Sequence, residues 1–343
     1  MGLYAMDKLI HAHTSGSSGE QLEVYWAEKD YYMSLLPLWI QRWKAAKIHP
    51  KDKVCFLNSC LPDGEDYRVE KSVMFISKSK LDYDRMSHIG ELIQEFRPRW
   101  LLLHPSAANL LCEVVVNENI DLHFLEYVEL TGEMYFEQLV KRIERLFSCT
   151  VKGHYGSMEM SSIGYELEHN RYEIFETSVY VEVLNEDGQP APLGEIGEIY
   201  VTSLQNYAMP FIRYCIGDRG KFLKNSTGKR VLEICGARNT EYLITENGER
   251  LNAELLLEPI IRLSMGGEKM VYQVQSQQTD VRELKILVVL DDEIERNEFV
   301  QYYLNNLDRH VSENFNIIFK FIDRVIFPNT DTGKVKWFTK LSK

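Results

Sequence analysis

The sequence predicts an α/β fold in which a large N-terminal domain of helix-covered sheets, with a β-rich subdomain, precedes a small α+β C-terminal domain. The first half alternates strand-like and helix-like segments, which favours a parallel sheet covered by helices. Residues 172–204 are rich in strands and glycine turns, and beyond Gly236 the pattern restarts as a small α+β unit. A length of 343 residues suits two such domains.

The elements of the first half follow from their hydrophobic patterns. A short strand at residues 8–13 precedes a Gly/Ser loop. An amphipathic helix follows, which Pro37 should kink, and its apolar residues at helical spacing are Leu35, Leu36, Trp39 and Trp43. Beyond it we expect strands at 54–57, 73–76 and 100–103, and helices at 87–96 and 133–147.

Glycine-containing turns indicate where the strands of the second half begin and end. Asp187-Gly188 marks a turn in the β-rich region, and the run LGEIGEIYVTSL follows it. In the C-terminal unit we expect an Asn247-Gly248 turn, a helix from Asn252, a strand at 283–290, a helix at 299–311 and a last strand at 317–327. The predicted domains are therefore residues 1–236 and 242–343, joined by a hinge at 237–241.

Composition and charge exclude several classes of protein. A net charge of −12 argues against nucleic acid as the main partner, because phosphate backbones require a basic surface. No apolar run is long enough to cross a bilayer, and the N-terminus does not have the pattern of a signal peptide. The six cysteines show neither CxxC nor zinc-ribbon spacing. We therefore expect a cytoplasmic protein with reduced thiols that binds neither membrane nor nucleic acid.

The Gly/Ser loop is the sharpest local motif. TSGSSG consists of Thr14, Ser15, Gly16, Ser17, Ser18 and Gly19. Its glycines allow close backbone approach, and N–H groups and hydroxyls after a strand can hold a polyphosphate. It is not a Walker loop, and the sequence has no GxGxxG. Taken alone, a plain flexible turn explains the motif equally well.

Three further segments carry candidate chemistry. In YGSME, Tyr155 could lie against a purine and Glu159 could bind a metal, although a packed tyrosine beside a solvated glutamate is the simpler alternative. In PFIRYCIGD, Asp218 suits a sugar diol and Arg213 a phosphate or carboxylate, with an internal ion pair as the alternative. In PNTDTGKVKW, Lys334 lies on a Thr-Gly turn, and in isolation it reads as a solvated charge.

The order of these segments resembles that of adenylate-forming enzymes of the acyl-CoA synthetase superfamily, most closely the phenylacetate–CoA ligase and capsule-biosynthesis branch. IHAHTSGSSGEQ resembles the phosphate loop of that family, YGSME its Tyr-Gly-x-Thr-Glu block, and PFIRYCIGD the block that ends in the ribose-binding aspartate. FRPRWLLLHPSAANLL resembles its strand-to-helix segment, LTGEM the Gly-Glu turn beside the adenine, GARNTEYLITENG the hinge block, and DTGKVKW the terminal lysine block.

The resemblance implies a reaction. Acid and ATP would give an acyl-adenylate and pyrophosphate, and the acyl group would pass to a thiol, of coenzyme A or an acyl or peptidyl carrier protein, or to an amine. ATP and Mg²⁺ are the implied cofactors, with coenzyme A as a co-substrate. Polar and small residues around 58–60, 130–131 and 154–162 favour a small aromatic or amino/hydroxy acid. The C-terminal domain would be mobile and would swing about the hinge between the two half-reactions.

The resemblance also implies roles for individual residues. Lys334, Glu159 and Arg213 would be catalytic; Lys334 would bridge the substrate carboxylate and the α-phosphate, and Glu159 would bind Mg²⁺. The phosphates of the nucleotide would be bound by the loop residues Thr14, Ser15, Gly16, Ser17, Ser18 and Gly19. The adenine would be lined by Gly132, Glu133, Tyr155 and Gly156. Asp218 would bind the ribose, and Arg238 would bind the ribose or a phosphate.

The sequence departs from the family pattern at several positions. Glu20-Gln21 replaces Lys-Pro after the phosphate loop, Met158 replaces a Thr or Ser, and Thr240-Glu241 replaces the hinge Asp pair. Glu166-Leu167 occupies the position of a cysteine-rich metal site, so no structural zinc is expected. Only thirteen residues precede Thr14, whereas many members use a longer segment there for dimerisation; a homodimer stays open. The rival interpretation is a degenerate, non-catalytic nucleotide-binding homologue.

Overall fold

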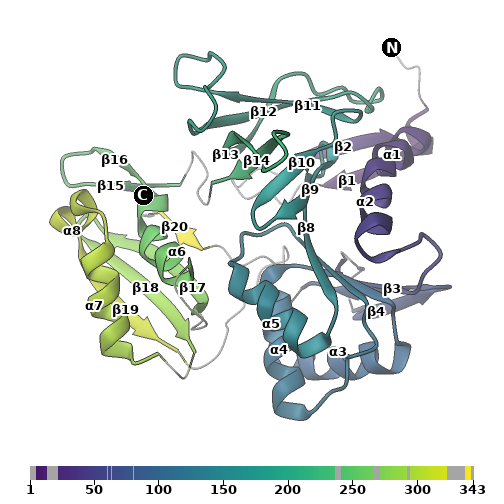
Figure 1. Cartoon of the computed structure of the whole chain (residues 1–343), viewed down its shortest axis with the longest axis horizontal. Coiled ribbons are helices and arrows are strands. Elements are labelled where there is room, and N and C mark those ends of the chain that lie inside the picture. The colour runs from purple at the N-terminus through teal and green to yellow at the C-terminus, as the bar shows by residue number, and fades with distance from the viewer. Residues whose placement is uncertain are drawn as a thin grey trace.

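The fold is described from a computed structural model, which covers residues 5–13, 22–59, 61–62, 64–79, 81–235, 241–265, 271–291, 294–322 and 337–340. Its largest element is a mixed sheet of 12 strands in the order β11-β12-β13-β14-β10-β9-β8-β7-β6-β3-β5-β4. A separate small unit follows it in the chain (Figure 1). The predicted α/β fold class is confirmed.

One half of the large sheet is parallel. Its strands are β3 (Val54–Ser59), β5 (Val73–Ser77), β6 (Trp100–Leu103), β7 (Tyr127–Thr131) and β8 (Thr150–Ser157), and β4 (Tyr67–Glu70) adds an antiparallel edge. The helices α3 (Tyr83–Phe96), α4 (Pro105–Glu118) and α5 (Glu137–Phe147) lie together against this half (Figure 1).

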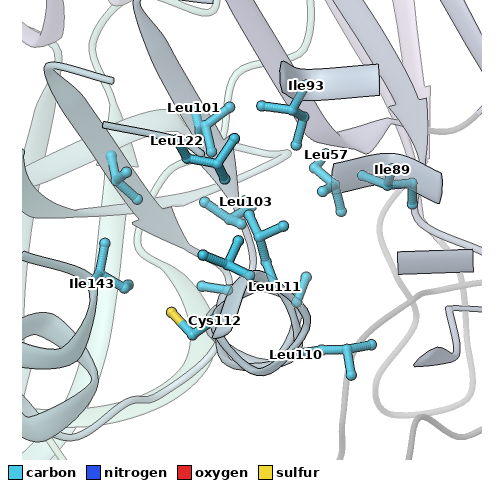
Figure 2. Close-up of a cluster of buried hydrophobic side chains, with 14 of the residues drawn as sticks. Leu57, Ile89, Ile93, Leu101, Leu103, Leu110, Leu111, Cys112, Leu122 and Ile143 are labelled. Carbon is cyan, nitrogen blue, oxygen red and sulfur yellow. The ribbon is translucent and has the colours of Figure 1, made fainter. Parts of the chain in front are cut away.

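A continuous apolar core joins these helices to the sheet. Leu57, Leu101 and Leu103 from the strands pack with Ile89 and Ile93 of α3, Leu111 of α4 and Ile143 of α5 (Figure 2). On the opposite face Ile48, Trp100, Leu102 and Tyr127 form a second cluster with Trp39. A strand buried on both faces reads as an uninterrupted apolar run, which is why WLLL predicts β6 without error.

The other half of the sheet is antiparallel. It comprises β9 (Ser161–Glu168), β10 (Arg171–Ile174), β11 (Val179–Leu184), β12 (Gly197–Ser203), β13 (Tyr214–Lys224) and β14 (Arg230–Ile234). The β8–β9 hairpin connects the two halves. A short hairpin of β1 (Leu9–His13) and β2 (Glu23–Ala27), preceded by the 3₁₀ turn η1 (Met6–Lys8), packs Val24 and Trp26 into the core of this half.

The small C-terminal unit has its own core. β15 (Tyr242–Ile244) and β16 (Arg250–Asn252) form a hairpin, and a four-stranded sheet has the order β19-β18-β17-β20. Its strands are β17 (Val271–Asp280), β18 (Glu283–Leu290), β19 (Asn316–Phe321) and β20 (Phe338–Thr339), and its helical segments are η2 (Ala253–Leu256), α6 (Glu258–Met265), α7 (Arg296–Asn306) and α8 (Arg309–Asn314). Buried residues of these helices and strands form one cluster, which includes Leu256, Ile286 and Phe299.

A polar contact links the small unit to the helices of the large one. The Asn109 side chain on α4 donates to the Tyr272 carbonyl of β17 at 2.7 Å. Arg142 of α5 donates to the Asn109 side-chain oxygen at 2.7 Å, and its guanidinium lies 4.4 Å from the Tyr272 ring centroid. One tyrosine is thus held through both its backbone and its ring by two helices of the other unit.

Three sequence predictions are corrected by the structure. The helix after the Gly/Ser loop is two helices, α1 (Glu28–Ser34) and α2 (Leu36–Ala46), and Pro37 lies in the first turn of α2, where a missing N–H costs nothing. Its buried residues are Leu38 and Arg42, whereas Leu36 and Trp43 are exposed. The helix expected at 299–311 is likewise divided into α7 and α8, and the helix expected at 133–147 begins only at Glu137.

The predicted domain limits at 236, 237–241 and 242 stay predictions, because residues 236–240 lie outside the described residues. Among the helices in the described ranges, none is both long and apolar enough to span a bilayer.

Candidate active site

The carboxyl ends of the neighbouring strands β6, β7 and β8 form the framework of the site. His104, directly after β6, has Nδ1 2.8 Å from the Thr131 carbonyl at the end of β7. The Thr131 hydroxyl in turn donates to the His154 carbonyl of β8 at 2.9 Å. Ligands of α/β proteins bind beyond the carboxyl ends of parallel strands. These contacts therefore hold the ends of β6, β7 and β8 together where a ligand is expected.

The Gly-Glu turn after β7 is held against helix α4. Gly132 has a φ of 83°, which only glycine adopts at little cost. The Glu133 carboxylate accepts hydrogen bonds from the Ser106 backbone N–H at 2.9 Å and from the Ser106 hydroxyl at 3.0 Å. Glu133 therefore caps the N-terminus of α4, where a negative charge is favourable. Its predicted place beside the adenine stays a prediction.

Tyr155 and Asp218 meet although 63 positions separate them. The Tyr155 hydroxyl donates to Asp218 Oδ2 at 2.9 Å, and the Tyr155 ring packs on Tyr172 with centroids 5.6 Å apart. Gly156 follows on β8, and any Cβ there would lie 2.3 Å from the Ser161 carbonyl oxygen. The predicted adenine-side and ribose-side residues are thus brought together by the β8–β9 hairpin and β13.

Glu159 lies in the turn between β8 and β9. Its Oε1 accepts a hydrogen bond from the Tyr214 hydroxyl, at the start of β13, over 3.0 Å. The two carboxylates predicted for ribose and metal, Asp218 and Glu159, are therefore each held by a tyrosine hydroxyl from the partner segment. A hydroxyl donor orients a carboxylate without cancelling its charge, which leaves both acids able to serve a polar or cationic ligand.

Arg213 forms an ion pair, and its catalytic role stays a prediction. It has a positive φ of 48°, its backbone N–H donates to the Thr202 hydroxyl, and its Nε lies 3.2 Å from Glu182 Oε2 on β11. The ion pair considered as the alternative is thus present, with Glu182 as the acid. The remaining predicted residues, Thr14, Ser15, Gly16, Ser17, Ser18, Gly19, Arg238 and Lys334, lie outside the described residues.

A buried polar network beneath the site was not predicted. Arg42 of α2 donates to both oxygens of Glu129 on β7, at 2.8 and 2.6 Å. Its guanidinium lies 4.6 and 4.7 Å from the ring centroids of Trp39 and Trp100. The Tyr127 hydroxyl donates to Glu129 Oε2 at 2.8 Å. A glutamate inside the otherwise apolar strand YVELT is the sequence feature that could have indicated the network.

Opposing effects set the ionisation of this network. Burial by itself raises the pKa of Glu129, but the charge and hydrogen bonds of Arg42 outweigh it, so the pKa lies below its ordinary value. Burial lowers the pKa of His154 to about 4, against the attraction of Glu129, whose Oε1 is 3.6 Å from His154 Nδ1. His154 is therefore neutral at neutral pH, with Nε2 2.9 Å from the Ser162 hydroxyl.

The lowered pKa of His154 predicts a pH-dependent stability. The unfolded chain binds a proton at this residue near pH 6.5 and the folded chain only near pH 4, so stability falls as the pH drops through this window. The free energy of unfolding of the wild type should fall between pH 7 and pH 4. We expect His154→Gln to make this fall smaller by up to about 3 kcal/mol. Denaturant unfolding of both proteins across this range measures it, and parallel pH profiles would contradict the assignment.

The sequence of this chain is similar to those of two protein families and of several known proteins. The family model "AMP-binding enzyme" matches residues 69–209, and the model "CapK C-terminal domain" matches residues 243–340. The protein CapK of Staphylococcus aureus is 22% identical over 96% of this chain and 74% of its own length. The phenylacetate-coenzyme A ligase of Escherichia coli strain K12 is 26% identical over 70% of this chain, which spans 57% of that enzyme's length.

The fold is also found among solved structures. A 2-hydroxyisobutyryl-CoA ligase in the postadenylation state, in complex with R3-HIB-AMP, superposes with a TM-score of 0.71 at 16% identity. The match covers 98% of this chain and 74% of that one. At this identity the likeness shows the fold alone.

Proposed function

Because this chain belongs to the adenylate-forming superfamily, on the branch of CapK and the phenylacetate–CoA ligases, we propose that it activates a carboxylic acid with ATP. The family and the structural neighbours are AMP-forming acid–CoA ligases. The products of the first step would be an acyl-adenylate and pyrophosphate. In the second step a thiol, of coenzyme A or of a carrier protein, or an amine would displace AMP. The availability of ATP and coenzyme A fits a cytoplasmic location.

The observation that carries the proposal is the pair of tyrosine-held carboxylates between the β8–β9 hairpin and β13. The Tyr155 hydroxyl holds Asp218, and the Tyr214 hydroxyl holds Glu159. A carboxylate accepts well from the two hydroxyls of a ribose, so Asp218 suits the sugar of ATP. The other carboxylate, on the β8–β9 turn, suits a cation that accompanies the phosphates.

Mg²⁺ fits the residues present. It is held in phosphate-transfer sites by one or two carboxylates together with phosphate oxygens and water. Glu159 is a partly exposed carboxylate on a turn, which matches this requirement, and it would hold the ion. When bound, Mg²⁺ supplies positive charge to the phosphates. The Tyr214 hydroxyl, which donates to Glu159 Oε1, holds this carboxylate in place.

The acid is proposed to be small and polar or aromatic. The residues where β6, β7 and β8 end include His104, Thr131 and His154, and His154 is neutral. Neutral donors and acceptors can recognise a ring substituent, an amino group or a hydroxyl group, whereas a long aliphatic chain offers them no hydrogen-bonding partner. We therefore favour a small aromatic or amino/hydroxy acid over a fatty acid.

ATP–pyrophosphate exchange with a panel of aryl, amino and hydroxy acids tests the proposal. We expect acid-dependent exchange with at least one acid, and we expect Asp218→Asn to lower it by about 10- to 100-fold, mainly through a higher KM for ATP. Asp187→Asn, in the exposed turn before Gly188, is the control and should match the wild type. Equal exchange in Asp218→Asn would contradict the assigned ribose contact.

The second candidate is a nucleotide-binding protein that does not catalyse. Its structural support is Met158, which is 49% exposed on the β8–β9 turn where the family has a hydroxyl residue. The Met158 carbonyl accepts from the Trp26 indole at 3.2 Å, so the backbone of this turn is held although the hydroxyl is missing. ATP binding without exchange for any acid of the panel would favour this candidate.

A further inference from the structure

The two oxygens of the Glu159 carboxylate have different surroundings. Oε1 accepts the hydrogen bond of the Tyr214 hydroxyl at 3.0 Å. Oε2 forms no hydrogen bond and no ion pair with any residue of the described ranges, and the side chain is partly exposed. One oxygen of this carboxylate is therefore bound to the protein, and the other is available to a ligand.

The backbone of the turn that carries Glu159 is fixed on both sides of it. The Met158 carbonyl accepts an indole N–H from β2 at 3.2 Å, and the Met160 N–H donates to the Ser157 hydroxyl at 3.2 Å. The Met160 side chain is buried in the core of the antiparallel half. Rotation of its own side chain is therefore the freedom that Glu159 keeps, and the hydrogen bond from Tyr214 restricts this rotation.

Tyr214 is held at the start of β13 through its backbone and its ring. Its backbone pairs with Val201 of β12, and its ring meets the Phe211 ring edge-on, with centroids 5.1 Å apart. Phe211 is itself buried in the core of the antiparallel half. The substitution Tyr214→Phe keeps the backbone and the ring and removes the hydroxyl, so it isolates the contribution of the hydrogen bond.

The number of available carboxylate oxygens influences which divalent ion a site prefers. Mg²⁺ is small, requires near-octahedral geometry and is bound through one or two carboxylates together with phosphate oxygens and water. Ca²⁺ is larger, takes about six to eight oxygen ligands and accepts both oxygens of one carboxylate. A carboxylate with one oxygen engaged by a hydroxyl therefore suits Mg²⁺ better than Ca²⁺.

We propose that Tyr214 is a positioning residue that holds Glu159 Oε1 and leaves Oε2 for the ion, so that the site favours Mg²⁺ over Ca²⁺. The inference rests on the proposed function, in which Glu159 holds the ion that accompanies the phosphates of ATP. Tyr214 acts through the carboxylate rather than on the ion. Hydrogen-bond partners of metal-binding carboxylates determine metal affinity in this way.

Calorimetric titration of the full chain with ATP, without any acid, tests the inference in the presence of Mg²⁺, of Ca²⁺ or of a chelator. The wild type should bind ATP most tightly with Mg²⁺. Tyr214→Phe should lose about 10- to 100-fold of the affinity that Mg²⁺ adds, because the Glu159 carboxylate is no longer oriented. The loss with Ca²⁺ should be at least about threefold smaller, since the released Oε1 lets the carboxylate bind that ion through both oxygens. Affinity in the chelator should not change.

Two further variants separate this role from a merely structural one. Tyr200→Phe is the matched control, because the Tyr200 hydroxyl donates to Glu198 Oε2 at 3.1 Å in the same sheet, and it should behave as the wild type. In a Glu159→Gln background, Tyr214→Phe should have no further effect on the affinity that Mg²⁺ adds, because Tyr214 acts through Glu159. Circular dichroism checks that each variant folds.

The outcomes distinguish this inference from the proposed function. A wild type that binds no ATP in any condition would overturn both. A wild type that depends on Mg²⁺, with a Tyr214→Phe variant that keeps the same preference between the two ions, would overturn the inference alone. An equal loss of affinity in Mg²⁺, Ca²⁺ and chelator would also overturn it, because Tyr214 would then support only the fold of the site.

Discussion

Lys334→Ala is expected to lower acid-dependent ATP–pyrophosphate exchange by about 10²- to 10³-fold while ATP binding stays within a few-fold of the wild type. A carboxylate that attacks the α-phosphate brings two anions together, and the charge must be offset where they meet. The terminal lysine block assigns this role to Lys334, which lies outside the described residues, so the role stays a prediction.

The described residues just after Lys334 show how its segment is anchored. The Ser276 backbone N–H donates to the Trp337 carbonyl at 2.6 Å, and Phe338 of β20 is 4% exposed against the core of the C-terminal unit. In the sequence, Lys334 precedes Phe338, the first residue of β20, by four positions.

Exchange assays and nucleotide binding by calorimetry check this prediction. Lys340→Ala is the matched control, because Lys340 belongs to the same terminal segment and lies 5.5 Å from the Tyr242 ring centroid. It should retain wild-type exchange. Exchange in Lys334→Ala at the wild-type rate would show that the lysine has no part in adenylation. A loss of both exchange and ATP binding would instead indicate that the lysine holds the nucleotide.

The fold was predictable where burial produces a simple pattern. WLLL reads as a strand buried on both faces, and the predicted strand 283–290 coincides with β18. The α1–α2 region misled because hydropathy identifies an apolar face but not whether that face is covered. Leu36 and Trp43 are exposed, while Arg42 turns inward to meet Glu129. The ion pair between Arg42 and Glu129, which are far apart in the sequence, fixes which face of α2 is buried. A local hydrophobic pattern cannot predict such a pair.

The candidate site was predictable in its residue types but not in its contacts. The order of motifs selects Tyr155, Glu159 and Asp218 without any knowledge of the sheet. Their pairing with one another and with Tyr214 joins β13 to the β8–β9 hairpin, although β14 and β10 lie between β13 and β9 in the sheet, and no local sequence pattern contains such a contact. Glu133 shows the same limit, because only the structure reveals that it caps α4.

Arg42→Met is expected to destabilise the protein by about 3–5 kcal/mol. The substitution keeps an apolar side chain against Trp39 and Trp100 but leaves the fully buried Glu129 carboxylate without its counter-charge. An unpaired charge in such a place is costly because water cannot reach it. Denaturant unfolding measures the loss, and Arg309→Met is the control. Its pair with Glu313 is exposed, so the change should stay within about 0.5 kcal/mol.

The double variant Arg42→Met with Glu129→Leu distinguishes two contributions to stability. One is the destabilisation by an unpaired buried charge, and the other is the stabilisation by the ion pair itself. If the orphaned carboxylate causes the loss, removing it should recover most of the stability, because apolar residues of similar volume replace buried ion pairs at little cost. A double variant as unstable as Arg42→Met would show that the pair itself supports the sheet. Glu129 lies two residues before Thr131 on the strand that leads into the Gly-Glu turn. If the Arg42–Glu129 pair is needed to position that turn, the double variant should fold but lose ATP–pyrophosphate exchange.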